Sequence, residues 1–437
     1  MDVFVIEGGR RLDGTLRING AKNAALPLMS AALLSDEPIT LLDVPALADT
    51  RNMLRLLAEL GCHRVNESDG PDATRVVLHS FDRAQSHARY DIVRTMRAGI
   101  CVLGPLLGRR GEARVSMPGG CTIGDRPVDL HLRGLRALGA DIQLAQGDIF
   151  AKAPGGRLRG ARVFLGGPMG STVLGTINVL AAATLARGET IIESAACEPE
   201  VVDMARLLTA MGAKISGAGS PRIVIEGVDS LGSATHAIVP DRIEAGTFMC
   251  AAAITNGDIV LENCPIDGLM SVIDRLEAVG VRFQAAPGQD PMHSTCRVTS
   301  SRVLQPVEVT TQPHPGFPTD LQAQIMALLC LADGNSVVTE KIFPERFMHV
   351  AELARMGARI HRHGSTAVIS GVKRLIGAPV MASDLRASAG LVLAGLAAEG
   401  TTIVNRVYHI DRGYERMEER LGALGARIER VDEKEVE

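Results

Sequence analysis

The chain has 437 residues, of which 46% are hydrophobic and 22% are charged, so it can bury a large core in roughly two to three domains. Its net charge is −4 and its Lys and Arg residues are dispersed, which argues against nucleic acid or a membrane surface as the main partner. Aromatic residues make up only 3%, which disfavours a base-stacking surface. The chain opens on a strand-like segment, and no apolar run approaches the ~20 residues of a membrane span, so we expect a cytoplasmic protein.

In chain order, the strand-like opening VFVIEGG is followed by helices and strands in alternation. One kind of helix is rich in small apolar residues on all sides, which predicts that it is buried. It recurs as AALPLMSAALL, MRAGICVLGPLL, TINVLAAATLA, GTFMCAAAI, LQAQIMALLCLA and RASAGLVLAGLAA. Apolar strands follow most of these helices, as in RGETIIES and NGDIVLEN, after a short turn with Gly or Asp.

A second kind of helix ends in a Leu, Met or Val followed by Gly, where a left-handed cap is expected. The capping glycines are Gly61, Gly139, Gly212, Gly280, Gly357 and Gly425. The spacing of about 70 residues indicates six copies of one α/β unit.

The two halves of the chain also match each other, because VFVIEGGRRLDGTLRINGAKNAA aligns with RIVIEGVDSLGSATHAIVPDRIEA. This alignment predicts two domains of three units each. The first spans residues 22–239, and the second combines residues 1–21 with residues 240–437. Two chain crossings between the domains predict a hinge that closes over a ligand.

Charged residues stand at the amino ends of the small-residue helices, namely Lys22, Arg97, Asp241, Asp320, Asp384 and Arg386. A second set, Arg126, Arg346 and Arg412, is expected to open the other helix of its unit. Aspartate is a common helix cap, but arginine gains nothing from a helix amino end, so the arginines indicate phosphate or carboxylate binding. We therefore expect a site for a small polyanionic ligand.

The segment RVSMPGGCTIGDRPVDLHLRG, residues 114–134, places the thiol of Cys121 after Pro118, Gly119 and Gly120. The glycines leave the sulfur uncovered, and the nearby Arg126 favours the thiolate, so Cys121 can serve as a proton donor or a nucleophile. An incidental cysteine in a surface turn is the alternative. The eight cysteines contain no C-x-x-C pair, so neither a zinc site nor a disulfide framework is indicated.

Eight motifs resemble the enolpyruvyl transferases, and among them the members that act on a UDP-sugar. They are INGAKNAALP, VRTMRA, PGGCTIGDRPVDLH, PDRIEAGTF, HPGFPTDLQAQ, ERFMHV, SDLRAS and YHIDRGYERME, and they extend over nearly the whole chain. The resemblance implies an α/β fold in the form of a two-domain inside-out α/β barrel, with six repeated units, three per domain. It also implies transfer of the enolpyruvyl group of phosphoenolpyruvate to the 3′-hydroxyl of UDP-N-acetylglucosamine, with release of phosphate and no metal or organic cofactor.

By the same resemblance, Cys121 protonates the methylene carbon of phosphoenolpyruvate and Asp320 accepts the proton of the acceptor hydroxyl. Lys22, Arg126 and Arg412 would hold the phosphate and the carboxylate. The other substrate-binding positions implied are Asn23, Arg97, Pro127, Val128, Asp129, Leu130, Ser171, Thr172, Val173, Asp241, Ile342, Arg346, Asp384, Arg386 and His409.

The sequence departs from the family pattern in GGPMGSTVLGTINVLAA, where Gly170 and Leu174 stand in place of the usual Lys and Gly. A cation on the diphosphate side is therefore missing. Two alternatives follow. One is an enolpyruvyl transferase with a different hydroxyl acceptor, and the other is a binding paralogue without catalysis. The presence of Cys121, Asp320 and Lys22 together argues against the second.

Overall fold

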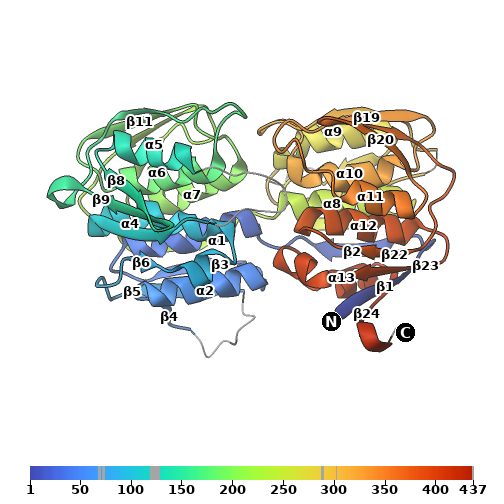
Figure 1. Ribbon diagram of the computed structural model, residues 1–437, viewed down its shortest axis with the longest axis horizontal. Coiled ribbons are helices and arrows are strands. Elements are labelled where there is room, and N and C mark those ends of the chain that lie inside the picture. The colour runs from blue at the N-terminus through green and yellow to red at the C-terminus, as the bar shows by residue number, and fades with distance from the viewer. Residues whose placement is uncertain (67–69, 71–73, 119–127, 287–289, 302, 436–437) are drawn as a thin grey trace. The chain divides into compact units, whose positions relative to one another are not determined.

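A computed structural model describes residues 1–66, 70, 74–118, 128–286, 290–301 and 303–435. The described chain divides into two compact units. The terminal unit holds both chain ends and consists of Met1–Asn19 and Pro240–Glu437, and the middle unit comprises the described residues between Gly20 and Val239 (Figure 1). The predicted limits at residues 22 and 239, and the hinge between the domains, stay predictions.

Three four-stranded sheets lie in the described part of the middle unit, with the strand orders β14-β3-β5-β4, β6-β7-β9-β8 and β10-β11-β13-β12. In each sheet the first pair is parallel and the other two pairs are antiparallel. The strands are β3 (Ile39–Leu42), β4 (Cys62–Arg64), β5 (Val76–Ser80), β6 (His87–Ala88), β7 (Glu112–Ser116), β8 (Asp141–Ala145), β9 (Asp148–Lys152), β10 (Arg162–Phe164), β11 (Glu189–Glu193), β12 (Lys214–Ser216), β13 (Arg222–Glu226) and β14 (Ala234–Ala237).

The described part of the terminal unit repeats this plan in three more sheets, β2-β15-β17-β16, β18-β19-β21-β20 and β22-β23-β1-β24. The parallel pair again comes first in each order. The strands are β1 (Asp2–Glu7), β2 (Asp13–Arg17), β15 (Asp258–Cys264), β16 (Arg282–Ala285), β17 (Ser294–Thr299), β18 (Glu308–Thr310), β19 (Asn335–Thr339), β20 (Arg359–His363), β21 (Thr366–Ser370), β22 (Pro379–Met381), β23 (Thr401–Asn405) and β24 (Arg427–Asp432). The predicted sixfold repeat, three units on each side, is confirmed.

The small-residue helices lie at the centre of each unit (Figure 1). The helices of the middle unit are α1 (Lys22–Ser30), α2 (Ala48–Glu59), α3 (Tyr90–Val93), α4 (Leu103–Arg110), α5 (Asp129–Ala137), α6 (Val173–Ala183) and α7 (Pro199–Ala210), with the 3₁₀ helices η1 (Ala31–Leu34), η3 (Arg97–Val102) and η4 (Pro154–Gly156). In the terminal unit they are α8 (Arg242–Ile254), α9 (Met270–Val279), α10 (Gln322–Leu329), α11 (His349–Arg355), α12 (Leu385–Ala397) and α13 (Met417–Ala423), with η5 (Asp267–Leu269), η6 (Thr319–Leu321), η7 (Val407–Arg412) and η8 (Glu433–Glu435).

The small-residue helices are buried, as predicted. In the terminal unit α8, α10 and α12 pack against one another, and α12 is buried from Arg386 to Leu396. Gly390 permits this close packing, because a Cβ atom there would lie 2.8 Å from the carbonyl oxygen of Ala323 on α10. The arrangement of helices inside and sheets outside confirms the inside-out α/β fold.

The six glycines that end the second kind of helix all have left-handed φ values, between 75° and 109°. A β-carbon is strained in this conformation, so glycine ends each helix and turns the chain toward the next strand. The predicted caps are therefore confirmed. Among the described residues, none of the helices combines the length and the apolar character that a bilayer crossing requires.

Candidate active site

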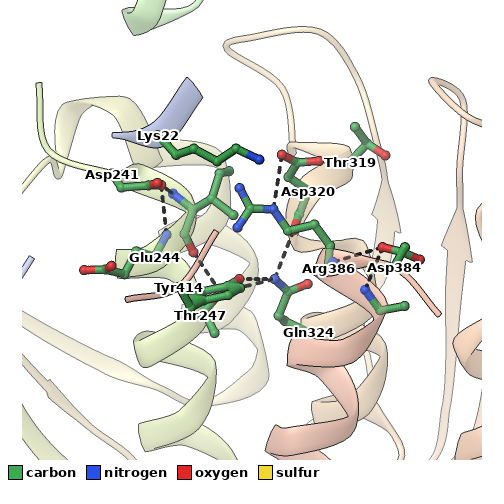
Figure 2. Close-up of polar contacts among 12 residues, drawn as sticks. Lys22, Asp241, Glu244, Thr247, Thr319, Asp320, Gln324, Asp384, Arg386 and Tyr414 are labelled. Carbon is green, nitrogen blue, oxygen red and sulfur yellow. Dashed lines mark hydrogen bonds and ion pairs between the residues drawn. The ribbon is translucent and has the colours of Figure 1, made fainter. Parts of the chain in front are cut away.

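Asp320 pairs with two arginines in the terminal unit, of which Figure 2 shows Arg386. Its Oδ1 accepts a hydrogen bond from Arg346 Nη1 at 2.8 Å, and its Oδ2 lies 3.3 Å from Arg386 Nε. The two arginine side chains are 7% and 2% exposed, and the Asp320 side chain is 23% exposed. The ion pairs offset much of the cost of burying the charges, while Asp320 keeps enough exposure to meet a ligand.

The amino ends of helices position these side chains. Asp320 lies in η6, directly before α10, and Arg386 lies in the first turn of α12. Asp384 caps α12, because its Oδ1 accepts from the backbone N–H groups of Arg386 at 2.9 Å and Ala387 at 3.1 Å. Asp241 caps α8 in the same way. Both caps fix the backbone that carries the charged residues.

The guanidinium of Arg386 has N–H donors available for a ligand. Within the described residues, its Nη1 and Nη2 are buried and have no hydrogen-bond partner, while its Cζ lies 5.3 Å from the centre of the Tyr414 ring. Burial opposes the charge, but Tyr414, Asp320 and Asp241 outweigh it and raise the pKa of Arg386. A charged, buried and unsatisfied fork of N–H donors suits an oxyanion.

Glu340 supports the second arginine, and sequence reasoning missed it. Glu340 is fully buried, and its Oε2 accepts from the hydroxyl of Thr319 at 2.9 Å. The same hydroxyl oxygen accepts from Arg346 Nη1 at 3.0 Å. Glu340 Oε1 also accepts from the backbone N–H groups of Ile342 and Phe343, so it shapes the segment that holds Ile342, a predicted substrate-binding residue. Its sequence signal was an acidic residue directly after the apolar strand β19.

In the middle unit, Lys22 begins α1 and its Nζ lies 2.7 Å from Asp49 Oδ2. The two side chains are 11% and 3% exposed. Asp49, in the first turn of α2, is a second residue that sequence reasoning missed, since it looked like an ordinary acid at a helix start. It fixes the ammonium group of Lys22 at the amino end of α1. Asn23 follows within α1, and Arg97 begins η3.

Two other predicted segments lie at helix starts of the middle unit. Val128 is the residue before α5, and Asp129 and Leu130 begin that helix. Ser171 precedes Thr172, which caps α6 by accepting from the backbone N–H of Gly175 at 3.2 Å, and Val173 begins the helix. Cys121, Arg126 and Pro127 lie outside the described residues, so their predicted roles stay predictions.

Gly170, which stands where the family pattern has Lys, lies in a backbone conformation that favours glycine. Gly170 has φ +97°, and it forms a tight pair with Gly167, with N–O distances of 2.8 and 3.0 Å. A side chain at this position would be strained. Leu174 is half-buried in the first turn of α6.

Two expectations about helix starts are wrong. Arg346 does not open α11, because it lies in a turn closed by its own N–H and the carbonyl of Phe343, and α11 starts at His349. Arg412 ends η7 rather than opening α13, because Arg416 has a left-handed φ of 44° and breaks the helical path. His409 also lies in η7, where burial and then Arg412 lower its pKa.

The family model described as EPSP synthase (3-phosphoshikimate 1-carboxyvinyltransferase) matches residues 6–421. The crystal structure of the enolpyruvyl transferase NikO from Streptomyces tendae superposes with a TM-score of 0.86 at 25% identity, covering 98% of this chain and 99% of that one. EPSP synthase from Acinetobacter baumannii shares the fold, with a TM-score of 0.77 at 20% identity over 99% of this chain and 100% of that one. The chain therefore belongs to the enolpyruvyl transferase family, and it is an enzyme.

Comparison with curated relatives assigns the chain to one branch of this family. A protein of Dinoroseobacter shibae is 56% identical over 99% of this chain and 100% of its own length, and one of Methylacidiphilum infernorum is 51% identical over 99% of both. Both relatives are named UDP-N-acetylglucosamine 1-carboxyvinyltransferase. The predicted family is confirmed, and the UDP-N-acetylglucosamine 1-carboxyvinyltransferases are the branch to which this similarity assigns the chain.

Proposed function

We propose that this enzyme transfers the enolpyruvyl group of phosphoenolpyruvate to the 3′-hydroxyl of UDP-N-acetylglucosamine and releases phosphate. The observation that carries the proposal is the identity of 51–56% along 98–99% of the chain to relatives named for this activity. The reaction would serve peptidoglycan precursor synthesis in the cytoplasm.

The proposed chemistry has two stages. In the first, the acceptor hydroxyl oxygen bonds to C2 of phosphoenolpyruvate while C3 gains a proton from Cys121 and the hydroxyl proton passes to Asp320. In the second, the tetrahedral intermediate loses a proton from C3 and expels phosphate, which restores the double bond in the product. A thiol at position 121 could also add to C2 and hold a covalent adduct.

The cluster around Asp320 supports the base role. Arg346 and Arg386 hold both carboxylate oxygens at 2.8 and 3.3 Å, so Asp320 has a fixed orientation. The open guanidinium of Arg386 provides N–H donors for an anionic reactant. Lys22, Arg126 and Arg412 would bind the phosphate and carboxylate, with Arg97 and Asp384 fixing the geometry.

A different hydroxyl acceptor is the second candidate. The turn at Gly170 favours it, because a residue with φ +97° and no side chain supplies no cation for a diphosphate. Leu174 adds bulk at the start of α6.

Phosphate release from phosphoenolpyruvate tests the proposal, measured with UDP-N-acetylglucosamine, with 3-phosphoshikimate and without acceptor. We expect phosphate release only when UDP-N-acetylglucosamine is the acceptor. Phosphate release only with 3-phosphoshikimate would overturn the proposed acceptor. Cys121→Ala should abolish or greatly slow the reaction without unfolding the protein. Near-normal turnover of this variant would remove Cys121 as the acid.

A further inference from the structure

Thr247, Gln324 and Tyr414 form a buried hydrogen-bonded set next to Asp320 and Arg386 (Figure 2). They come from α8, from α10 and from the segment between η7 and α13, and each side chain belongs to a residue no more than 2% exposed. Gln324 Nε2 lies 3.1 Å from Thr247 Oγ1, 3.1 Å from the Tyr414 hydroxyl and 3.0 Å from the backbone oxygen of Asp320. None of the three has a role in the proposed chemistry.

The acceptors determine the direction of each hydrogen bond in this set. Thr247 donates its single hydroxyl proton to the carbonyl of Ile243 at 2.8 Å, so only lone pairs remain on that oxygen. The Tyr414 hydroxyl, 2.8 Å away, must then donate to Thr247. The backbone oxygen of Asp320 can only accept, which fixes the amide of Gln324 with its nitrogen on that side. The amide nitrogen of Gln324 has two protons for three acceptors, so one of its N–H groups is shared between two of them.

The set meets both members of the Asp320–Arg386 pair. Gln324 holds the backbone of Asp320, and the ring of Tyr414 lies under the guanidinium of Arg386 at 5.3 Å. Burial raises the pKa of Tyr414, although Arg386 opposes that shift, so the hydroxyl stays a proton donor at neutral pH. The guanidinium is thus supported by a neutral ring and by Asp320, and its Nη donors stay open.

We propose that Thr247, Gln324 and Tyr414 are positioning residues that hold Asp320 and Arg386 in the geometry needed for enolpyruvyl transfer. They act through these two residues and touch no substrate themselves. The proposal rests on the proposed function, because it assigns the network to the base and to an anion-binding guanidinium of that reaction.

Two threonines give a matched test, Thr247 within α8 and Thr255 directly after its last residue. Thr247 and Thr255 are both buried, and each donates to the carbonyl four residues earlier at 2.8 Å, but only Thr247 contacts Gln324 and Tyr414. Thr247→Val should lower kcat about tenfold with KM for UDP-N-acetylglucosamine unchanged, because small misplacements of reacting groups are costly. Thr255→Val should keep the wild-type kcat. Thr247→Ser should also keep a kcat near that of the wild type, because serine retains the hydroxyl. Equal kcat values for the two valine variants would overturn the proposal.

Tyr414→Phe removes the hydroxyl and keeps the ring. It should also lower kcat about tenfold, since the donor to Thr247 is lost. Tyr90→Phe is the control, because Tyr90 also lies beside an arginine, with Arg94 Cζ 5.8 Å from its ring, but it is exposed and belongs to the middle unit. An unchanged kcat for Tyr414→Phe would contradict the role of the hydroxyl.

A binding measurement separates this proposal from the proposed function. If wild-type protein releases no phosphate with UDP-N-acetylglucosamine, the proposed acceptor fails. Isothermal titration with phosphoenolpyruvate alone still tests the positioning of Arg386. Weaker binding by Thr247→Val than by Thr255→Val would support the network, and equal binding by the two variants would overturn it.

Discussion

Each unit buries a polar network among its central helices, and the two networks differ in what they leave unsatisfied. In the middle unit, Asn178 on α6 accepts from Gly104 N at 2.7 Å and donates to the carbonyl of Ile100 at 3.0 Å and to His131 Nδ1 at 2.9 Å. In the terminal unit, Gln324 Oε1 and both Nη atoms of Arg386 have no partner within the described residues.

We interpret the Asn178 network as structural and the network around Arg386 as one that can bind a ligand. Asn178 uses its side chain to fix the junction of η3 and α4 against α5, and every contact is internal. A closed network of this kind specifies the packing. The network of the terminal unit ends instead on the charged pair of Asp320 and Arg386, and buried donors without partners are costly unless a ligand meets them. We therefore expect changes in the first network to reduce stability and changes in the second to reduce turnover.

Asp320→Asn should have the largest effect. The amide keeps the size of the side chain but cannot accept the hydroxyl proton, so kcat should fall about 10³-fold, the middle of the range for general acid–base catalysis. Steady-state kinetics on folded protein, with unfolding by urea measured in parallel, would show this. The exposed Asp333 provides the control variant Asp333→Asn, which should keep wild-type kcat. A higher KM for phosphoenolpyruvate with unchanged kcat would instead make Asp320 a binding residue.

Asn178→Leu should have the next largest effect, on stability. It leaves the N–H of Gly104 and the carbonyl of Ile100 buried without their partner, so the free energy of unfolding should fall by about 3 kcal/mol. Asn405→Leu is a control that removes one side-chain hydrogen bond, from Nδ2 to the carbonyl of Val380 at 3.1 Å. Urea unfolding should therefore separate the two variants. Equal losses of stability would mean that the Asn178 network adds nothing beyond a single hydrogen bond.

Local signals allowed much of the fold to be predicted. The small-residue helices and the six capping glycines depend on neighbouring residues, and so does the capping by Asp241 and Asp384. The contacts that complete the sites are not local. Thr247 and Tyr414 are 167 residues apart, and Lys22 meets Asp49 only because α1 and α2 pack together. The position of Arg412 was mispredicted because the left-handed φ of Arg416 has no signal in its residue type.

Acid should weaken the closed network through His131. Burial, and then the nearby charge of Arg97, lowers the pKa of His131 from 6.5 to about 3. Asn178 Nδ2 donates to Nδ1 of the ring, so the neutral form is the one that fits. The unfolded chain binds a proton below pH 6.5 and the folded chain does not, so the stability that His131 contributes is complete above pH 6.5 and is lost as pH falls toward 3.

The free energy of unfolding should therefore decline by at most about 1.4 kcal/mol per pH unit from this group as pH falls from 6 to 4. His131→Asn keeps an acceptor for Asn178 and cannot titrate, so its decline should be shallower than that of the wild type. His349 in the terminal unit has a pKa lowered to about 4, chiefly by burial, and it is present in both proteins. The difference between the two urea curves at each pH thus isolates His131, and parallel curves would show that protonation of this ring does not oppose folding.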